Sequence, residues 1–241
     1  MAVARIIQGA VVVALMAVTL STARAEEASP AAAISPEPLT ECTVEPRPMS
    51  ELRQLVMRGI DDYVTGATPV PVAVAGAEEG KPVDAETEAA VTATILQFTD
   101  CTNAGYFPGM AALATDEMMA RPLGRVAIYA GHLFAGRPGT PAPFETPTAA
   151  ALDAYLITLQ FPQPLPEAEQ SAVLEIRDVR TLGNGRVWAT VVTASQAEPN
   201  PETDTVYLRW SGDRYLIEGT SRGEAADSVS PSATPATPSA A

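Results

Sequence analysis

The stretch that decides the fold is SAVLEIRDVRTLGNGRVWATVVTA, residues 171–194. Apolar and polar residues alternate with a period of two on both sides of Gly183-Asn184-Gly185, which is the pattern of two half-buried strands. Asn184 and Gly185 are the residue types that supply the two positive φ angles of a tight hairpin turn. The stretch therefore predicts a long β-hairpin.

A second hairpin follows a polar loop, with strands at 205–210 (TVYLRW) and 214–219 (RYLIEG) around the turn Ser211-Gly212-Asp213. The preceding half of the chain has helical periodicity. Helices are expected to begin at Ser50, Asp84, Phe107 and Thr148, while residues 126–134 fit a helix or a strand. Helices followed by four antiparallel strands predict an α+β domain, with the helices packed on one face of a curved sheet.

The N-terminus has the features of an export signal. Arg5 precedes an apolar run at 6–20, and the small side chains of Ala23 and Ala25 suit a signal peptidase. A membrane anchor is the alternative, but the run is shorter than the roughly 20 residues that a spanning helix needs. We expect cleavage before Glu26 and a location outside the cytoplasm, in the periplasm, at the cell surface or in the medium.

The charge balance argues against several kinds of partner. The chain has 29 acidic and 15 basic side chains, a net charge of −14, and its acidic residues are spread along the sequence. Nucleic acids and anionic membranes are bound through clustered Lys and Arg, so neither is an expected partner. Contact with a membrane is expected only through an uncleaved export signal.

Residue counts also limit the cofactors. The single histidine excludes sites that need two, and two cysteines exclude cysteine-rich zinc motifs and iron–sulfur clusters. The sequence contains no phosphate loop, glycine-rich dinucleotide turn or nucleophile elbow. We therefore expect no metal and no cofactor.

The two cysteines, Cys42 and Cys101, allow one intramolecular bridge, which an oxidising compartment favours. Closing a loop of roughly 60 residues stabilises a fold by about 4 kcal/mol in the chain-entropy model. A structural disulfide is the prediction, and two buried free thiols are the alternative.

The order of elements resembles the nuclear-transport-factor-2-like superfamily, which includes the SnoaL-like polyketide cyclases and the ketosteroid isomerases. The resemblance rests on a long helix at 84–105, on the turn from Asn103-Ala104-Gly105 into 110–113, and on the last hairpin at 206–217. It implies a cone-like curved antiparallel sheet wrapped around a long helix, with a ligand site at the mouth of the cone.

The resemblance also implies a division of the chain. Residues 84–220 would form the domain, and residues 42–83 a helical extension and loop pinned to it by the disulfide. Residues 26–41 and 221–241 are rich in Ala, Ser and Pro and are expected to be a disordered linker and tail.

Family enzymes place a carboxylate or histidine with a tyrosine inside the cone. In the predicted hairpin Leu182 faces Val187, and one shared face then holds a mostly apolar set: Leu174, Ile176, Asp178, Arg180, Val187, Ala189 and Val191. Asp178 on that dry face would be a general base. The alternative is a β-bulge that turns Asp178 and Arg180 outward, or an Asp–Arg pair at the sheet rim.

Two further groups of residues are site candidates. His132 with Tyr129, one turn away if the segment is helical, is a second acid–base candidate, against an ordinary packed histidine. The residues expected to line a ligand pocket are Phe98, Tyr106, Phe107, Ile176, Val191, Tyr207 and Arg209. On the last hairpin either Tyr207, Arg209 and Tyr215 share the inner face, or Val206, Leu208 and Leu216 do.

Two functional hypotheses follow. The first is an exported, non-catalytic module that binds a small apolar ligand or another protein. The second is a small-molecule isomerase, lyase or hydrolase of the polyketide-cyclase type. A homodimer formed through the convex sheet face, as in family relatives, is a further possibility.

Overall fold

A run of helices precedes a C-terminal antiparallel sheet in the computed structural model, which describes residues 41–66, 80–134 and 146–222. The helices are α2 (Met49–Val64), α3 (Ala85–Asn103), α4 (Phe107–Ala112), α5 (Asp116–Phe134), α6 (Ala149–Leu159) and the short η2 (Glu167–Glu169). The strands are β1 (Lys81–Pro82), β2 (Ala172–Gly183), β3 (Arg186–Ala194), β4 (Glu202–Trp210) and β5 (Tyr215–Arg222). The predicted α+β class is confirmed.

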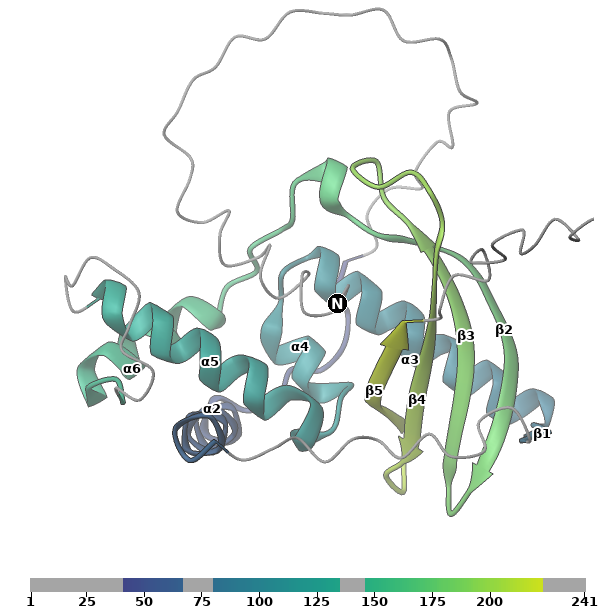
Figure 1. The fold of residues 1–241 in the computed structure, drawn as a ribbon, viewed down its shortest axis with the longest axis horizontal. Helices are drawn as coiled ribbons and strands as arrows, with labels where there is room; N and C mark the ends of the chain where they lie inside the picture. The colour runs from purple at the N-terminus through teal and green to yellow at the C-terminus, as the bar shows by residue number, and fades with distance from the viewer. Residues whose placement is uncertain (1–40, 67–79, 135–145, 223–241) are drawn as a thin grey trace, which may run out of the picture.

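The sheet has five strands in the order β1-β2-β3-β4-β5, and every neighbouring pair is antiparallel. Strand β1, which the sequence did not predict, pairs with β2 at its edge (Figure 1). The two-residue turn is confirmed, because Gly183 pairs with Arg186 and Asn184 and Gly185 both have positive φ. The predicted pairing of Leu182 with Val187 is wrong, since a register shift gives that place to Thr181.

A β-bulge in β2 decides where Asp178 lies. Between the pairs Arg177–Thr190 and Arg180–Trp188, strand β2 has two residues, Asp178 and Val179, where β3 has one. The backbone of Asp178 is left-handed, with φ 55°, and Val179 takes the buried position. The bulge alternative is therefore correct, and the predicted inner-face positions of Asp178 and Arg180 are wrong.

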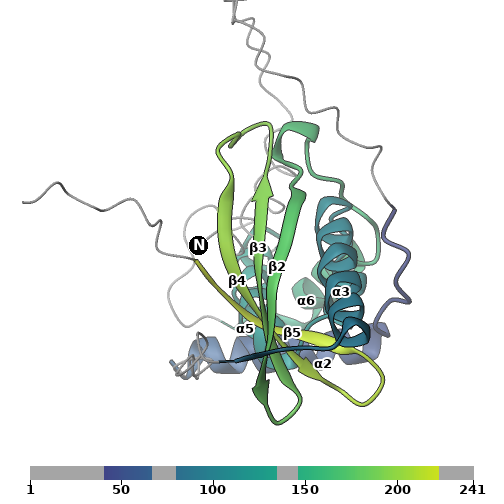
Figure 2. The same cartoon turned by 90° about the vertical axis from the view of Figure 1, so that its right-hand side faces the viewer.

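A second register shift, between Val173 and Glu175, moves Leu174 out of the predicted inner face, and its side chain is exposed. Each extra residue on one strand reverses the alternation beyond it, so a strict period of two fails along β2. Bulges also bend a strand and increase its twist, which accords with the curved strands of Figure 2.

Local capping explains where two helices begin. Asp84 accepts a hydrogen bond from the Thr87 N–H at 2.8 Å, so the predicted cap of α3 is confirmed. Thr148 caps α6 in the same way through Ala151. Helix α2 instead begins at Met49, with Pro48 in the cap position and no side-chain cap bond, so the expected start at Ser50 is wrong.

The segment at 126–134 is helical and belongs to α5, which starts at Asp116 and contains Pro122. No helix within residues 41–66, 80–134 and 146–222 combines the length and apolar composition needed to cross a membrane. The expected signal at 1–25 and most of the linker lie outside the described residues. Strand β5 runs to Arg222, two residues into the predicted tail.

Helices and sheet share one continuous core. Figures 1 and 2 show α3 lying along the curved sheet. Helices α2, α5 and α6 lie together to one side of the sheet. The core cluster contains residues from all of these helices and from β2 to β5, including the fully buried Leu52, Val91, Leu123 and Leu208. Helix α2 is therefore an integral part of the core.

The tightest packing lies where α2 crosses α5. A Cβ on Gly59 would overlap the backbone carbonyl of Ala120, and a Cβ on Gly124 would overlap the backbone of Gly59 and Ile60. The two helices thus meet backbone to backbone, and only glycine permits this approach. This crossing, in addition to the disulfide, holds α2 against the rest of the domain.

Candidate functional site

The predicted disulfide between Cys42 and Cys101 is present, with Cα atoms 4.5 Å apart. Cys101 is fully buried at the end of α3. A Cβ on Gly109 of α4 would lie only 2.5 Å from the Cys42 sulfur, so glycine lets α4 approach the bridge. The Arg47 N–H also donates to the Pro108 carbonyl at 3.0 Å. These contacts fix the segment before α2 onto α4.

Eight charged side chains of alternating sign form a continuous surface chain, which we call the charged ladder. In order along the ladder they are Glu51, Arg47, Asp116, Arg58, Glu117, Arg209, Glu218 and Arg186. Its shortest contacts are Arg47 Nη1 to Asp116 Oδ1 and Arg186 Nε to Glu218 Oε2, both 2.7 Å. With four arginines and four carboxylates, it carries no net charge.

The charged ladder accounts for Arg209, a candidate ligand-binding residue. Arg209 contacts Glu117 of α5 at 3.5 Å and Glu218 of β5 at 3.7 Å. The ladder joins α2, the start of α5 and strands β3 to β5. Exposed ion pairs contribute little singly and more as networks, so its main effect is to fix the helices against the sheet.

Glu117 should make stability depend on pH. Its pKa lies below the ordinary 4.5, chiefly because of the backbone hydrogen bond at its own residue and further because of Arg58. A lowered folded-state pKa contributes stability above the ordinary pKa, and that contribution is lost as pH falls through the lowered value. Wild type should therefore exceed Glu117→Gln in free energy of unfolding at neutral pH, and the difference should shrink below pH 4.5. Urea unfolding at a series of pH values measures this, and a difference independent of pH would contradict it.

Asp178 lies at the surface, where its half-exposed carboxylate contacts Arg177 Nε at 3.8 Å and Arg180 Nη2 at 4.0 Å. Arg180 also donates to the Gly80 carbonyl at 3.1 Å, which ties it to the segment preceding β1. A base on a dry inner face would have to be buried, and this carboxylate is not. The bulge thus turns the first catalytic candidate toward solvent.

Tyr129 and His132 both belong to α5, so they lie one turn apart as the helical alternative requires. The Tyr129 ring is 5.9 Å from the Arg125 guanidinium, at cation–π distance. The side chain of His132 lies outside the described part of the structure. For Tyr129 the observed contact is therefore with an arginine on its own helix.

Most of the predicted pocket residues are used for packing. Phe107, Val191 and Tyr207 are buried, and Phe98 and Ile176 pack against the core cluster. Of the predicted set, Ile176 and Val191 are brought together as cross-strand partners. Tyr106 is half-buried in the cap position before α4.

Neither predicted alternation of the last hairpin is fully correct. Val206 and Leu208 are buried on the inner face as one alternative expected, but Ile217 joins them instead of Leu216. The pairing of Trp210 with Tyr215 at the turn sets this register, which places Ile217 opposite Leu208 and Leu216 opposite Arg209. Tyr207 is buried as well, and its hydroxyl lies 3.3 Å from that of Ser221.

The buried polar side chains of the described residues serve the fold. Thr94 and Thr102 donate to carbonyls one turn earlier on α3, and Thr115 accepts from the Met118 N–H. Asn103 donates to the Ser171 carbonyl at 2.8 Å and accepts from its N–H at 3.0 Å, which fixes the chain just before β2. Within the same residues no three His, Cys, Asp or Glu side chains gather in a way that could hold a metal ion.

Within the described residues, two buried polar atoms are exceptions, the Nε1 of Trp188 and the hydroxyl of Tyr155 on α6. The Tyr155 hydroxyl has no hydrogen-bond partner within the described structure, and burial raises its pKa above the ordinary value of 10. An unpaired buried hydroxyl costs about 1–3 kcal/mol, so Tyr155→Phe should raise the free energy of unfolding by about 1 kcal/mol. Urea unfolding of the two proteins tests this. A less stable Tyr155→Phe protein would mean that the hydroxyl has a partner, such as an ordered water.

The exposed Trp210 and the partly buried Tyr215 form an aromatic pair at the end of the sheet that sequence reasoning missed. They are cross-strand partners with ring centroids 5.1 Å apart and planes inclined by 62°. Trp210 continues the inner row of β4, in which Val206 is 6%, Leu208 0% and Trp210 44% exposed. We call this pair the aromatic corner. The alternation that buries Val206 and Leu208 runs on to Trp210 and was the available signal.

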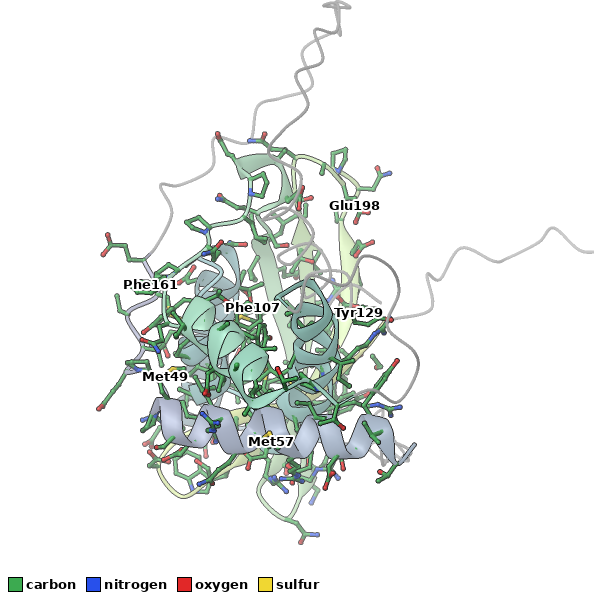
Figure 3. All side chains as sticks on the ribbon, turned by 90° about the vertical axis from the view of Figure 1, so that its left-hand side faces the viewer. Met49, Met57, Phe107, Tyr129, Phe161 and Glu198 are labelled. Atoms are coloured by element: carbon green, nitrogen blue, oxygen red, sulfur yellow. A yellow bond between two sulfur atoms is a disulfide. The ribbon has the colours of Figure 1, made fainter. Side chains whose placement is uncertain are left out.

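Other large apolar side chains are also exposed. Met57 on α2 and Phe161 after α6 lie on the side of the molecule that faces the viewer in Figure 3, and Ile157 on α6 is exposed as well. Unlike the aromatic corner, these residues do not continue a row of core side chains on a strand. Single exposed apolar residues are normal on protein surfaces.

No protein-family model matches the chain, and no curated protein or solved structure matches it either.

Proposed function

We propose that this chain is an exported, non-catalytic binding module, whose partner is a small apolar ligand or a segment of another protein. The observation that carries the proposal is that polar side chains of the described residues bond to the backbone or to one another. The four buried Thr and Asn side chains hydrogen-bond to the backbone, while the arginines of the charged ladder pair with carboxylates at exposed or partly buried positions. General acid–base catalysis needs such groups converging on a substrate.

The proposed fold family is the nuclear-transport-factor-2-like superfamily. The long helix α3 lying along an antiparallel sheet supports it, as does the sequence of hairpins from β2 to β5. In this proposal the curved sheet and α3 correspond to the family's cone. Fold alone does not assign an activity, so binding is argued from the side chains.

Export is proposed from two independent features. The first is the signal-like segment at 1–25, with small residues before Glu26. The second is the disulfide between Cys42 and Cys101, since disulfides persist mainly in oxidising compartments. Together they favour a location in the periplasm, at the cell surface or in the medium.

The competing function is an isomerase, lyase or hydrolase that uses Asp178 or His132 as its base. The observation in its favour is the one-turn spacing of Tyr129 and His132 on α5. Turnover of a panel of apolar enones and esters, measured for wild type, Asp178→Asn and His132→Ala, decides between the two functions. We expect all three proteins to remain at the buffer rate. Turnover by wild type that either substitution abolishes would overturn the proposal.

A further inference from the structure

The aromatic corner lies on the core-facing side of the sheet, but its Trp210 is not covered as the rest of its row is. Trp210 follows Val206 and Leu208 in the same row, yet it is 44% exposed, and Tyr215 packs edge-on against its ring. Because the two rings on neighbouring strands are inclined to each other, a ligand could pack on the face of one ring and contact the other ring at its side. Such surfaces bind proline-rich segments in the polyproline II conformation, which is ordered before binding and so loses little entropy.

The chain itself contains a segment of this chemistry. The sequence after β5 includes Pro235-Ala236-Thr237-Pro238. A polyproline II helix has three residues per turn, so in that conformation Pro235 and Pro238 would share one edge and Pro231 would not share that edge with Pro235. The two proline rings would then meet an aromatic surface together.

The segment can reach the aromatic corner. Strand β5 starts at Tyr215 and ends at Arg222, a span of about 23 Å at roughly 3.3 Å per residue. From Gly223 to Pro235 an extended polyproline II chain covers about 37 Å at roughly 3.1 Å per residue, which is enough to return along β5.

Charge also fits this occupant. At the corner Asp213 and Arg214 neutralise each other, with Arg214 Nε 3.3 Å from Asp213 Oδ2. Residues 228–241 carry no charged side chain. The other proline-containing terminal stretch, 26–40, has Glu37 between two of its prolines. A neutral surface is therefore matched by a neutral proline segment.

We propose that the aromatic corner of Trp210 and Tyr215 binds the chain's own C-terminal segment through Pro235 and Pro238. This inference concerns a contact within one chain and does not depend on the proposed function. The aromatic corner would then be a proline-binding surface. A proline-rich segment of another protein would have to displace the chain's own C-terminal segment to bind there.

The test uses the full-length chain and its two tryptophans. Trp188→Phe leaves Trp210 as the sole indole, and among the described residues the Trp188 Nε1 has no hydrogen-bond partner to lose. In that background we compare Pro235→Ala/Pro238→Ala with the matched control Pro231→Ala. The double substitution should red-shift the Trp210 emission and roughly double its quenching by iodide, because the ring loses its cover. The control should behave as the parent does.

Two results would overturn the inference. One is equal quenching of Trp210 in the double variant, the control and the parent. The other is protection that disappears on dilution, which would assign the occupant to a second copy. If Trp188→Phe prevents folding, the indole N–H resonance of Trp210 in otherwise wild-type full-length protein, assigned with Trp210→Phe, gives the same comparison. That resonance should shift in the double variant and stay in place in Pro231→Ala, and the reverse would contradict the inference.

Discussion

Replacing Gly124 with alanine should lower the free energy of unfolding by about 3 kcal/mol, although the same change in an open helix would raise it by about 1 kcal/mol. The sign reverses because the new Cβ would overlap the backbone of Gly59 and Ile60 on α2. Helices α2 and α5 would have to separate, and the buried contacts of Leu52 and Leu123 would loosen. Urea unfolding followed by circular dichroism gives the difference.

Gln54→Ala, at an exposed position of α2, is the matched control for this experiment and should change stability by less than about 0.5 kcal/mol. Gly59→Ala should reproduce the loss, because its Cβ meets the Ala120 carbonyl from the other side. A Gly124→Ala protein as stable as wild type would show that the two helices do not meet at this point.

Removal of the disulfide is the second large effect. The bridge joins cysteines separated by 59 positions, and Cys42→Ala/Cys101→Ala should lower the free energy of unfolding by about 4 kcal/mol in the chain-entropy model. The unfolded chain gains the freedom that the bridge removed, and the segment before α2 loses its anchor on α4. Urea unfolding under oxidising conditions measures the loss.

A reductant supplies the control for the disulfide experiment. It should destabilise wild type by about the same amount as the double substitution, since both open the same loop. It should leave the double variant unchanged. A wild-type protein whose unfolding is insensitive to reductant would contradict a stabilising bridge between Cys42 and Cys101.

Elements marked by short-range signals were predictable from the sequence. Asn184-Gly185 fixed the hairpin turn, and Asp84 capped α3, because both signals act within a few residues of backbone. The disulfide was expected because the chain has two cysteines and a predicted export signal. The exclusion of paired-histidine and cysteine-rich metal sites likewise needed only residue counts.

Features that depend on distant packing were not predictable. By sequence, residues 126–134 fit a helix or a strand. The structure makes them part of α5, in which Gly124 lets α2 cross in contact. The bulge at Asp178 has no separate sequence signal, because a left-handed aspartate looks like any other strand residue until its partner strand is known. The inner-face assignment of Asp178 failed for that reason.

The candidate site was the least predictable part. Arg209 is a predicted ligand-binding residue, but its guanidinium pairs with Glu117, which is 92 positions away in sequence, and with Glu218 on the neighbouring strand. The alternation along β4 places Trp210 in the inner row, but it does not show whether a helix covers the end of that strand. The exposure of Trp210 depends on where the helices lie against the sheet.

The central claim is an exported binding module closed by its single disulfide, and mass spectrometry of the intact protein from the extracytoplasmic fraction tests it most directly. The account predicts a chain that begins at Glu26 and is lighter by about two hydrogens than the same chain after reduction, because one bridge forms. A chain recovered only from the cytoplasm, with the first 25 residues attached and both thiols open to alkylation, would contradict it.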